Sequence, residues 1–392
     1  MTAAMLYDEA DGISKKICMQ ASALSYNNSL SALICLGRQC ILKLSFSNGN
    51  LAEKKEIAKI QDIQYNGKMS VTNEFKAISV LLDAVRKEII CNKPNLIYIR
   101  HMIPQFKLVS VLKTAQSRGV RVGYEIPTYP YYREQLNVSQ NKIKTLVKLG
   151  LETFFWPFIY KNINKLFAIR CSSKSPLFKK MVSIKNGYSG EKHDFCIRNI
   201  ENLNMIGVGT IYPYHGYDRI IEAMKKCNCK LRTGGEIFFH IVGQSNEIEN
   251  LKTTIDSKTK EHVIFHGVKY GEELEKLYRE ANLGVGTLKL SLRNADIDTA
   301  IKNIEYLSYY LPVISSGNIF DLSGKGLYYK VIKESKNIDF NKIALFVWRF
   351  YNDTSNTAVI NKELFDFRWS NIMDKIKTIL SDNEENINGR RV

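Results

Sequence analysis

Two ionisable side chains near the start of a predicted helix have the types and the spacing that bind a phosphorylated ligand. Lys302 and Glu305 lie one helical turn apart, and so on one face, directly after the loop Leu288–Thr299. A carboxylate accepts hydrogen bonds from a pair of hydroxyl groups, whereas a lysine and the free amides of a helix start attract phosphate oxygens. Arg293, within the loop, reaches the same charge. The alternative for these three side chains is an ordinary solvated surface.

Two residues of the first half also carry a candidate role. Gly12 follows a short apolar run, and without a Cβ atom its loop brings backbone amides close to a phosphate or a sugar. Glu125 ends the predicted strand Val120–Ile126, where we expect it to orient an acceptor hydroxyl or bind the sugar rather than act as a general base. A tight turn is the ordinary alternative for Gly12.

The elements that position these residues alternate between strand-length apolar runs and helix-length amphipathic stretches, which is typical of α/β proteins with parallel sheets. In the first half we predict the helices Ile13–Leu24, Phe75–Ile90 and Phe106–Gln116 and the strands Leu33–Cys35, Cys40–Phe46, Leu96–Ile99 and Val120–Ile126. After the polar stretch 185–202 the pattern restarts, with the strands Met205–Val208, Phe238–Val242, Val263–Phe265, Leu283–Gly286 and Val313–Ser315. Such sheets bind ligands at the carboxyl ends of their strands.

Composition narrows the class of partner. The chain has 392 residues, 45% of them hydrophobic, which favours two domains over one. Its net charge of +17 implies an anionic partner such as nucleic acid, an anionic lipid surface or a phosphorylated ligand. The lysines are spread over both halves and no nucleic-acid-binding signature accompanies them, so we expect no nucleic acid.

Neither a signal peptide nor an apolar run long enough to cross a bilayer is apparent, so we expect the chain to stay in the cytoplasm. The eight cysteines are scattered and form no pair of CxxC elements, which argues against a disulfide framework or a zinc site. No Asp-x-Asp element of the metal-dependent kind stands out, and we expect no metal and no other cofactor.

The segment Lys142–Lys165 stands apart from its surroundings. It packs aromatic residues between lysines, an arrangement suited to the surface of an anionic membrane; the aromatic and apolar residues are Phe154, Phe155, Trp156, Phe158, Ile159 and Tyr160. A buried helix-turn-helix with extended lysine side chains explains the same pattern equally well.

A series of short motifs runs through the chain in a fixed order. They are DGISKK (11–16), EIPTYPY (125–131), SIKNG (183–187), GTIYPYHG (209–216), HIVG (240–243), HVIFHG (262–267), KNIEYL (302–307) and LPVI (311–314). Each is weak alone. Together they resemble family 4 glycosyltransferases (glycosyl transferases group 1), and EIPTYPY resembles the branch that builds bacterial capsule and other surface polysaccharides.

The resemblance covers nearly the whole chain and implies a GT-B architecture. Two facing Rossmann-like, doubly wound domains are then expected around an interdomain cleft. Residues 1–195 would form the acceptor-binding domain and residues 196–368 the nucleotide-sugar-binding domain. Residues 369–392 would form a C-terminal helix that crosses back to the first domain, because FRWSNIMDKIKTIL is amphipathic.

The resemblance also implies the activity of a retaining, hexosyltransferase-type enzyme. A nucleotide sugar would be the donor, and a lipid-linked or oligosaccharide acceptor would receive the sugar at the inner face of the plasma membrane. On the front-face route that the family implies, the leaving phosphate helps to accept the proton, so no protein nucleophile is expected.

Specific residues follow from the same resemblance. Glu305 would bind the donor ribose and Lys302 the diphosphate, with Glu125 as a further catalytic candidate. The donor-binding set also contains Gly12, Thr210, His215, Gly243, Gly267, Val268 and Arg293. The family's arginine and lysine fall on Thr210 and His215, and its first acidic residue falls on Ile297, which Asp296 and Asp298 flank.

These departures keep other functions open. A non-catalytic GT-B subunit, binding sugar or glycan as the partner of an active transferase, would need neither the missing charges nor the missing carboxylate. A sugar-nucleotide epimerase also has two facing doubly wound domains and would turn over without an acceptor.

Overall fold

The computed structural model describes residues 1–9, 11–60, 70–139, 141–191, 193–196, 198–320 and 322–382. The chain forms two compact units, each described by itself. Unit 1 contains Met1–Arg170, Lys174–Lys185 and Trp369–Val392, and unit 2 contains Cys171–Ser173 and Asn186–Arg368. The sequence placed the first boundary after residue 195, whereas residues 186–195 group with unit 2.

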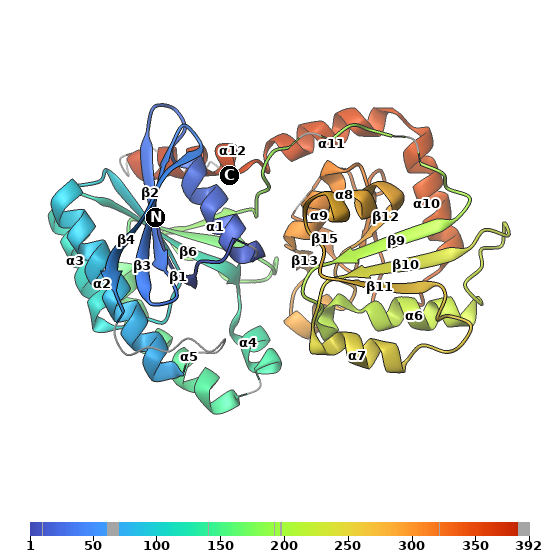
Figure 1. Cartoon of the computed structure of the whole chain (residues 1–392), viewed down its shortest axis with the longest axis horizontal. Helices are drawn as coiled ribbons and strands as arrows, with labels where there is room; N and C mark the ends of the chain where they lie inside the picture. The colour runs from blue at the N-terminus through green and yellow to red at the C-terminus, as the bar shows by residue number, and fades with distance from the viewer. Residues whose placement is uncertain are drawn as a thin grey trace. The chain divides into compact units, whose positions relative to one another are not determined.

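In the described part of unit 1, the strands form one eight-stranded sheet (Figure 1). In spatial order they are β4 (Asn50–Lys59), β3 (Cys40–Ser47), β2 (Leu30–Leu36), β1 (Thr2–Leu6), β5 (Leu96–Arg100), β6 (Arg121–Tyr129), β7 (Lys165–Arg170) and β8 (Met181–Ile184). β2, β3 and β4 are antiparallel neighbours, and the other pairs are parallel. The strand order runs in opposite directions on the two sides of β1, so the junction of β1 and β5 is the topological switch point at which such sheets bind ligands.

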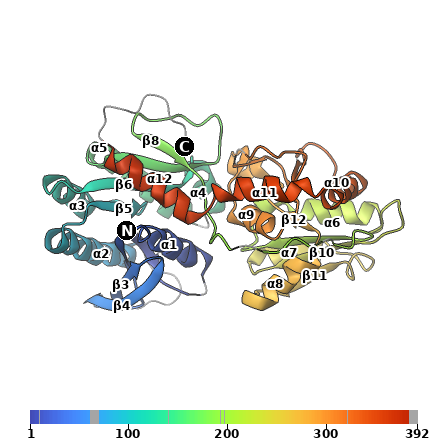
Figure 2. The ribbon, with the colours of Figure 1, turned by 90° about the horizontal axis from the view of Figure 1, so that it is seen from above.

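Helices cover both faces of this sheet (Figures 1 and 2). They are α1 (Gly12–Ala23), α2 (Val71–Asn92), α3 (Phe106–Ser117), α4 (Tyr132–Val138), α5 (Lys142–Lys161) and α12 (Trp369–Ser381). One core joins α2, α3 and α5 to residues such as Ile34 and Tyr124, and the other joins α1 to Leu33 and Cys35. Alternate residues of one strand thus serve opposite cores, as the pleat requires.

The last helix, α12, packs within unit 1. It contacts α1 and β6, and the ammonium group of Lys16 lies 5.6 Å from the ring centre of Trp369. The helix begins at Trp369 and buries Ile372, Met373 and Ile376, so one amphipathic face accounts for its position.

Unit 2 contains a parallel sheet whose described strands follow the order β11 (Val263–Gly267), β10 (Ile237–Val242), β9 (Leu203–Val208), β12 (Leu283–Val285), β14 (Val313–Ser315) and β16 (Tyr329–Val331). Two short strands, β13 (Ile297–Asp298) and β15 (Asn318–Ile319), pair separately. The helices are α6 (Tyr217–Lys226), α7 (Asn246–Thr253), α8 (Gly271–Glu280), α9 (Ile301–Ser308), α10 (Phe340–Asn352) and α11 (Ser355–Phe365), with 3-10 turns η1 (Pro213–His215) and η2 (Leu290–Arg293).

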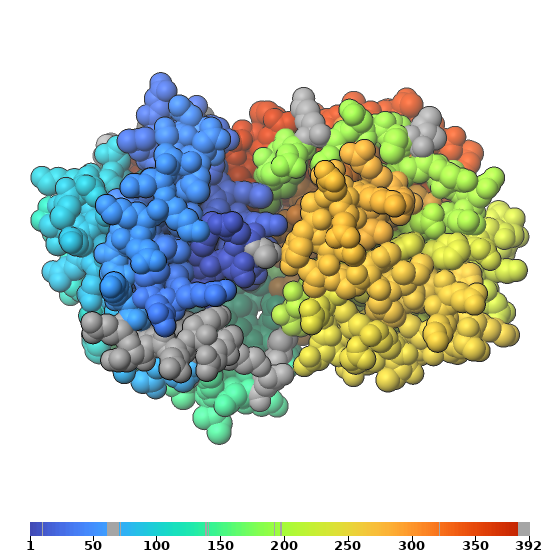
Figure 3. Space-filling view, in the orientation of Figure 1, coloured from blue at the N-terminus to red at the C-terminus, as the bar shows by residue number. Residues whose placement is uncertain are grey.

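The structure differs from the sequence expectation in several elements. The segment Lys142–Lys165 contains the single helix α5 rather than a helix-turn-helix, even with Pro157 inside it. β4 was missed because its charged residues are exposed on both faces and leave no alternation; it lies at the molecular surface in Figure 3. β6 runs to Tyr129, so Glu125 lies within the strand rather than at its end. Within the described residues, every helix falls short of the length and apolarity that a membrane span needs.

Candidate functional site

Three loops meet at the carboxyl edge of the parallel sheet in unit 2. β9, β10 and β11 end next to Gly209, Gly243 and Gly267. The amide of Gly243 donates to the carbonyl oxygen of Gly267 at 2.7 Å. A Cβ atom on Gly243 would lie 1.9 Å from the carbonyl oxygen of Gly209, and its φ of +134° is left-handed. Only glycine therefore fits at this position, and the backbone forms this part of the site.

Lys302 lies in the first turn of α9 and is buried, at 8% exposure. Its Nζ donates to the hydroxyl oxygen of Tyr217 at 3.1 Å and lies 5.2 Å from the centre of that ring. Burial lowers the pKa of Lys302 to about 7, although the charge of Asp298 acts in the opposite direction. A bound anion would favour the charged form of this lysine.

His215 closes the turn η1 beside the same lysine. Its Nδ1 accepts the amide hydrogen of Tyr212 at 3.0 Å, so the neutral ring carries its proton on Nε2. Burial, and then the charges of Lys302 and Arg293, lower the pKa of His215 well below its usual value. The guanidinium of Arg293 lies 4.9 Å from the ring centre of Tyr214. The structure thus brings His215, Arg293 and Lys302 into one electrostatic cluster.

Asp298 is a buried carboxylate whose charge acts on Lys302. It is fully buried and accepts hydrogen bonds from the amide of Thr287 at 2.7 Å, from the Thr287 hydroxyl at 3.1 Å and from the Ser315 hydroxyl at 2.9 Å. Asp296 instead accepts from the amide of Ser173 at 2.8 Å. Asp296 therefore bonds to the segment that follows β7, whereas Asp298 joins the residues after β12 to the end of β14 and supplies a negative charge near Lys302.

Glu305 lies in the middle of α9 rather than at its entrance, and it is half-buried. Its side chain approaches Tyr278 of α8: burial, and then the charge of Glu305, raise the pKa of the Tyr278 hydroxyl well above its usual value. At the end of the helix, the hydroxyl of Ser308 donates to the carbonyl oxygen of Glu305 at 2.7 Å. The side chain of Glu305 thus lies near Tyr278 of α8, and its backbone carbonyl oxygen is bonded within the last turn of α9.

The remaining donor-binding candidates of unit 2 lie at the surface. Thr210 is exposed directly after β9, and Val268 is 42% exposed directly after Gly267. Thr210 and Val268 therefore flank the glycines at the carboxyl ends of β9 and β11.

Two candidates, Gly12 and Glu125, belong to unit 1. Gly12 begins α1, its φ is not left-handed, and a Cβ atom there would meet nothing within 4 Å. Its backbone therefore does not require glycine, contrary to the steric reason expected from the sequence.

Glu125 is fully buried, and both of its oxygens are bonded. Oε1 accepts from Arg100 at 2.8 Å and Oε2 accepts from Gln20 at 2.8 Å. Although burial raises it, the charges of Arg100 and Lys16 bring the pKa of Glu125 below its usual value. This geometry favours a structural role for Glu125 over direct contact with an acceptor.

The sequence did not single out Tyr217, whose hydroxyl bonds to Lys302. Its ring packs closely against the backbone of Gly207, where a Cβ atom would lie 2.4 Å from the Tyr217 hydroxyl oxygen. A glycine in the middle of an apolar strand is the one signal that could have indicated such a close approach.

The described residues include no group of three His, Cys, Asp or Glu side chains placed to hold a metal ion. The expectation that the protein binds no metal came from the sequence motifs, and it stays a prediction.

Part of the chain matches a known family model. Residues 198–320 match the family model of glycosyl transferases group 1, and this span contains every unit 2 candidate. No curated protein sequence matches the chain significantly.

Several solved structures share the fold over 97% of this chain. WaaG, a glycosyltransferase involved in lipopolysaccharide biosynthesis, is 13% identical, with a TM-score of 0.56 and 99% of its chain covered. A glycosyltransferase from Rickettsia africae ESF-5 is 10% identical, with a TM-score of 0.56 and 98% covered. A structure described as trehalose-6-phosphate from E. coli bound with UDP-2-fluoro glucose is 10% identical, with a TM-score of 0.53 and 98% covered. The expected GT-B class of two Rossmann-like α/β domains is confirmed, and the match over residues 198–320 to glycosyl transferases group 1 supports glycosyl transfer.

Proposed function

We propose that this protein is a retaining glycosyltransferase that moves a hexose from a nucleotide-sugar donor to a lipid-linked or oligosaccharide acceptor of a bacterial capsule or surface polysaccharide. The observation that carries the proposal is the cluster of His215, Arg293 and Lys302 within the region that matches glycosyl transferases group 1. No metal or cofactor takes part, because these side chains supply the positive charge that a diphosphate needs.

Each residue of the cluster has a distinct role in donor binding. Lys302 and Arg293 offset the charge that grows on the departing phosphate, and the Nε2–H of His215 donates a fixed hydrogen bond. These groups replace the charges that Thr210 and His215 lack relative to the family. Glu305 accepts hydrogen bonds from the ribose diol, and the glycine loops at Gly243 and Gly267 line the donor with backbone.

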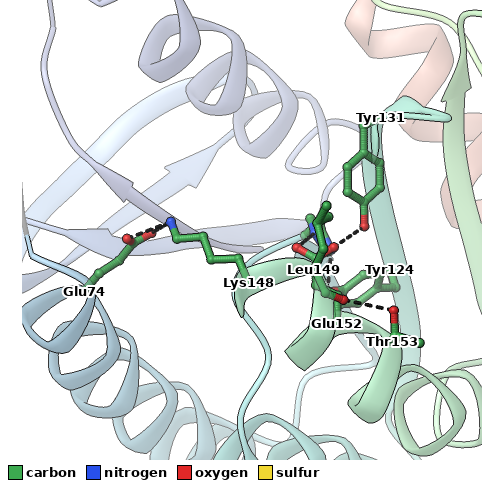
Figure 4. Close-up of polar contacts among 8 residues, drawn as sticks. Glu74, Tyr124, Tyr131, Lys148, Leu149, Glu152 and Thr153 are labelled. Carbon is green, nitrogen blue, oxygen red and sulfur yellow. Dashed lines mark hydrogen bonds and ion pairs between the residues drawn. The ribbon is translucent and has the colours of Figure 1, made fainter. Parts of the chain in front are cut away.

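We also propose that unit 1 docks on an anionic membrane surface through α5. The buried side of α5 is fixed by polar contacts, which Figure 4 shows. Glu152 accepts from the hydroxyl of Tyr131 at 2.6 Å and lies 3.1 Å from Nε2 of His101. One turn earlier, Lys148 pairs with Glu74 at 2.9 Å. These contacts hold one face of the helix against unit 1.

The opposite face of α5 carries an apolar stripe. Ile143 is 77% exposed, Val147 53%, Phe154 57% and Phe158 48%, at spacings that keep them on one side of the helix. Exposed lysines, Lys142 and Lys161, lie at its two ends. An apolar stripe bounded by cations matches a lipid surface with anionic headgroups, and the net charge of +17 acts in the same direction.

Two measurements test the proposed activity. Thermal unfolding with a panel of nucleotide sugars should identify the donor, since a ligand that binds the native state raises the melting temperature. Slow hydrolysis of that donor by the purified protein, with release of free sugar, should then follow. Stabilisation without any hydrolysis or transfer would favour the non-catalytic subunit, and conversion of the donor without acceptor or hydrolysis would favour an epimerase.

A further inference from the structure

A cavity within unit 2 lies apart from the residues assigned to the donor. Its volume is about 410 Å³, within the range of small-molecule sites. The walls include Tyr188, Glu191, His193, Asp194, Tyr310 and Arg368. None of the donor-binding candidates contributes to its lining.

Both donors and acceptors of hydrogen bonds line this cavity. The carboxylates of Glu191 and Asp194 are exposed acceptors. The Nε–H of Arg368 is buried and finds no hydrogen-bond partner among the described residues, which is costly for a charged donor. Asn361 uses its Oδ1 to accept from the hydroxyl of Tyr310 at 3.0 Å, so its amide hydrogens remain as donors.

These groups discriminate between ligand classes by charge. A phosphate would satisfy Arg368 but would face Glu191 and Asp194, and an ammonium group would satisfy the carboxylates but repel Arg368. A hydroxyl group both donates and accepts, so a polyhydroxylated neutral ring satisfies both kinds of wall. The rings of Tyr188 and Tyr310 supply apolar surface for such a ring.

We propose that this cavity is a second carbohydrate site, which binds a neutral sugar residue through Glu191, Asp194, Asn361 and Arg368. The sugar is either free or the end of a glycan, and the two sources share the same chemistry.

The cavity is joined to the proposed donor site through α9, and this part of the inference rests on the proposed function. Ser308, which lines the cavity, donates its hydroxyl to the carbonyl oxygen of Glu305, and the amide of Tyr309 donates to the same oxygen at 3.2 Å. The ring of His193 stacks on Tyr309 with centres 3.6 Å apart. A bound sugar would therefore stabilise the last turn of the helix that carries Lys302 and Glu305.

Saturation-transfer NMR and calorimetry with methyl hexosides and their oligosaccharides, without any nucleotide, test the inference on the full chain. Binding should weaken tenfold or more in Asn361→Trp, which fills the cavity, and in the double variant Glu191→Gln with Asp194→Asn. Glu261→Gln, an exposed carboxylate elsewhere in unit 2, is the matched control and should bind as the wild type does. Equal affinity for monosaccharide and oligosaccharide indicates a free sugar, and a gain with length indicates a glycan end.

Three results overturn the inference: no binding of any neutral sugar, binding that both cavity variants retain, or a preference for spermidine or inorganic phosphate. The double variant keeps the test decisive if Asn361→Trp fails to fold. Because the assay contains no nucleotide sugar, its result does not depend on whether the protein transfers sugar. A protein that binds sugar here but transfers none retains this inference and loses the proposed function.

Discussion

The ammonium group of Lys302 lies 3.1 Å from the hydroxyl oxygen of Tyr217, and no carboxylate of the described part of the chain forms an ion pair with it. Asp298, whose negative charge acts on Lys302, already accepts hydrogen bonds from Thr287 and Ser315. A buried lysine with a neutral partner gives up its proton readily, and a bound anion restores it. We therefore expect anion binding at this site to be coupled to proton uptake.

Binding of a nucleotide sugar should take up close to one proton at pH 8 and almost none at pH 6. The pKa of Lys302 is about 7 in the empty site, and the bound diphosphate raises it, so affinity should fall as pH rises above 7. Nucleotide sugars carry no phosphate that titrates in this range. Calorimetry in buffers of different ionisation enthalpy measures the uptake.

Two variants test whether Lys302 is the group that takes up the proton. Lys302→Met should abolish the uptake, and Lys226→Met, an exposed lysine on α6, should retain it. Because Lys302 has a lowered pKa in the folded state, the wild type should also gain stability relative to Lys302→Met as pH rises from about 7 towards 10.5. Uptake that persists in Lys302→Met would contradict the assignment.

Replacement of Glu305 should separate function from stability. Glu305→Ala removes an acceptor of two ribose hydroxyl bonds, each contributing about 1.5 to 3 kcal/mol, so donor affinity should fall by roughly two orders of magnitude or more. Sugar transfer should be lost with it. Glu305 is only half-buried, so we expect little change in the free energy of unfolding.

Calorimetry of donor binding checks this expectation, with Glu272→Ala, an exposed glutamate of α8, as the control. Wild-type donor affinity in folded Glu305→Ala would remove the central residue of the proposed donor site.

Glu125→Ala should show the opposite pattern to Glu305→Ala. Its removal leaves Arg100 partly buried without its ion-pair partner, which costs about 3 to 5 kcal/mol in the free energy of unfolding. The lowered pKa of Glu125 means that its contribution is present above pH 4.5 and is lost as pH falls. Urea unfolding at pH 7 and at pH 4 measures both effects. A stable Glu125→Ala protein that transfers no sugar would instead return Glu125 to the catalytic candidates.

The contrast between Glu305 and Glu125 shows which features of the site could be predicted from the sequence. The motif order predicted the fold, because strands such as β9 and β10 are short, mostly apolar runs that are followed directly by glycine. It also placed Lys302 and Glu305 on one helix, because that requires only local spacing. The sequence could not reveal that Glu125 is buried against Arg100 and Gln20, because those contacts join residues far apart in the chain.

Burial also decides which residues of α5 can reach a membrane. From the sequence alone, Phe154, Phe155 and Trp156 are equal candidates for membrane contact. In the structure, however, Phe155 is 4% exposed and Trp156 packs against Tyr124 and Phe178. Only Phe154 of the three continues the exposed stripe. A test that replaces all three would mainly damage the core of unit 1.

Replacing Ile143, Val147 and Phe154 with serine should therefore weaken binding to anionic vesicles while the protein stays folded. Partial insertion of three apolar side chains contributes roughly 2 kcal/mol or more, so partitioning should fall at least about thirtyfold. Co-sedimentation with vesicles that contain phosphatidylglycerol measures it. Binding should also weaken with salt, because each lysine near the surface contributes about 1 kcal/mol and is screened within a Debye length.

The matched control for this triple variant lies in unit 2. Leu345, Trp348 and Phe365 are 47%, 52% and 54% exposed, so replacing them with serine removes similar apolar surface from another part of the chain. That control should sediment as the wild type does, because those residues carry no stripe flanked by lysines at both ends. Equal loss in the two triple variants would indicate non-specific apolar adsorption, and no loss in the α5 variant would exclude this helix as the docking surface.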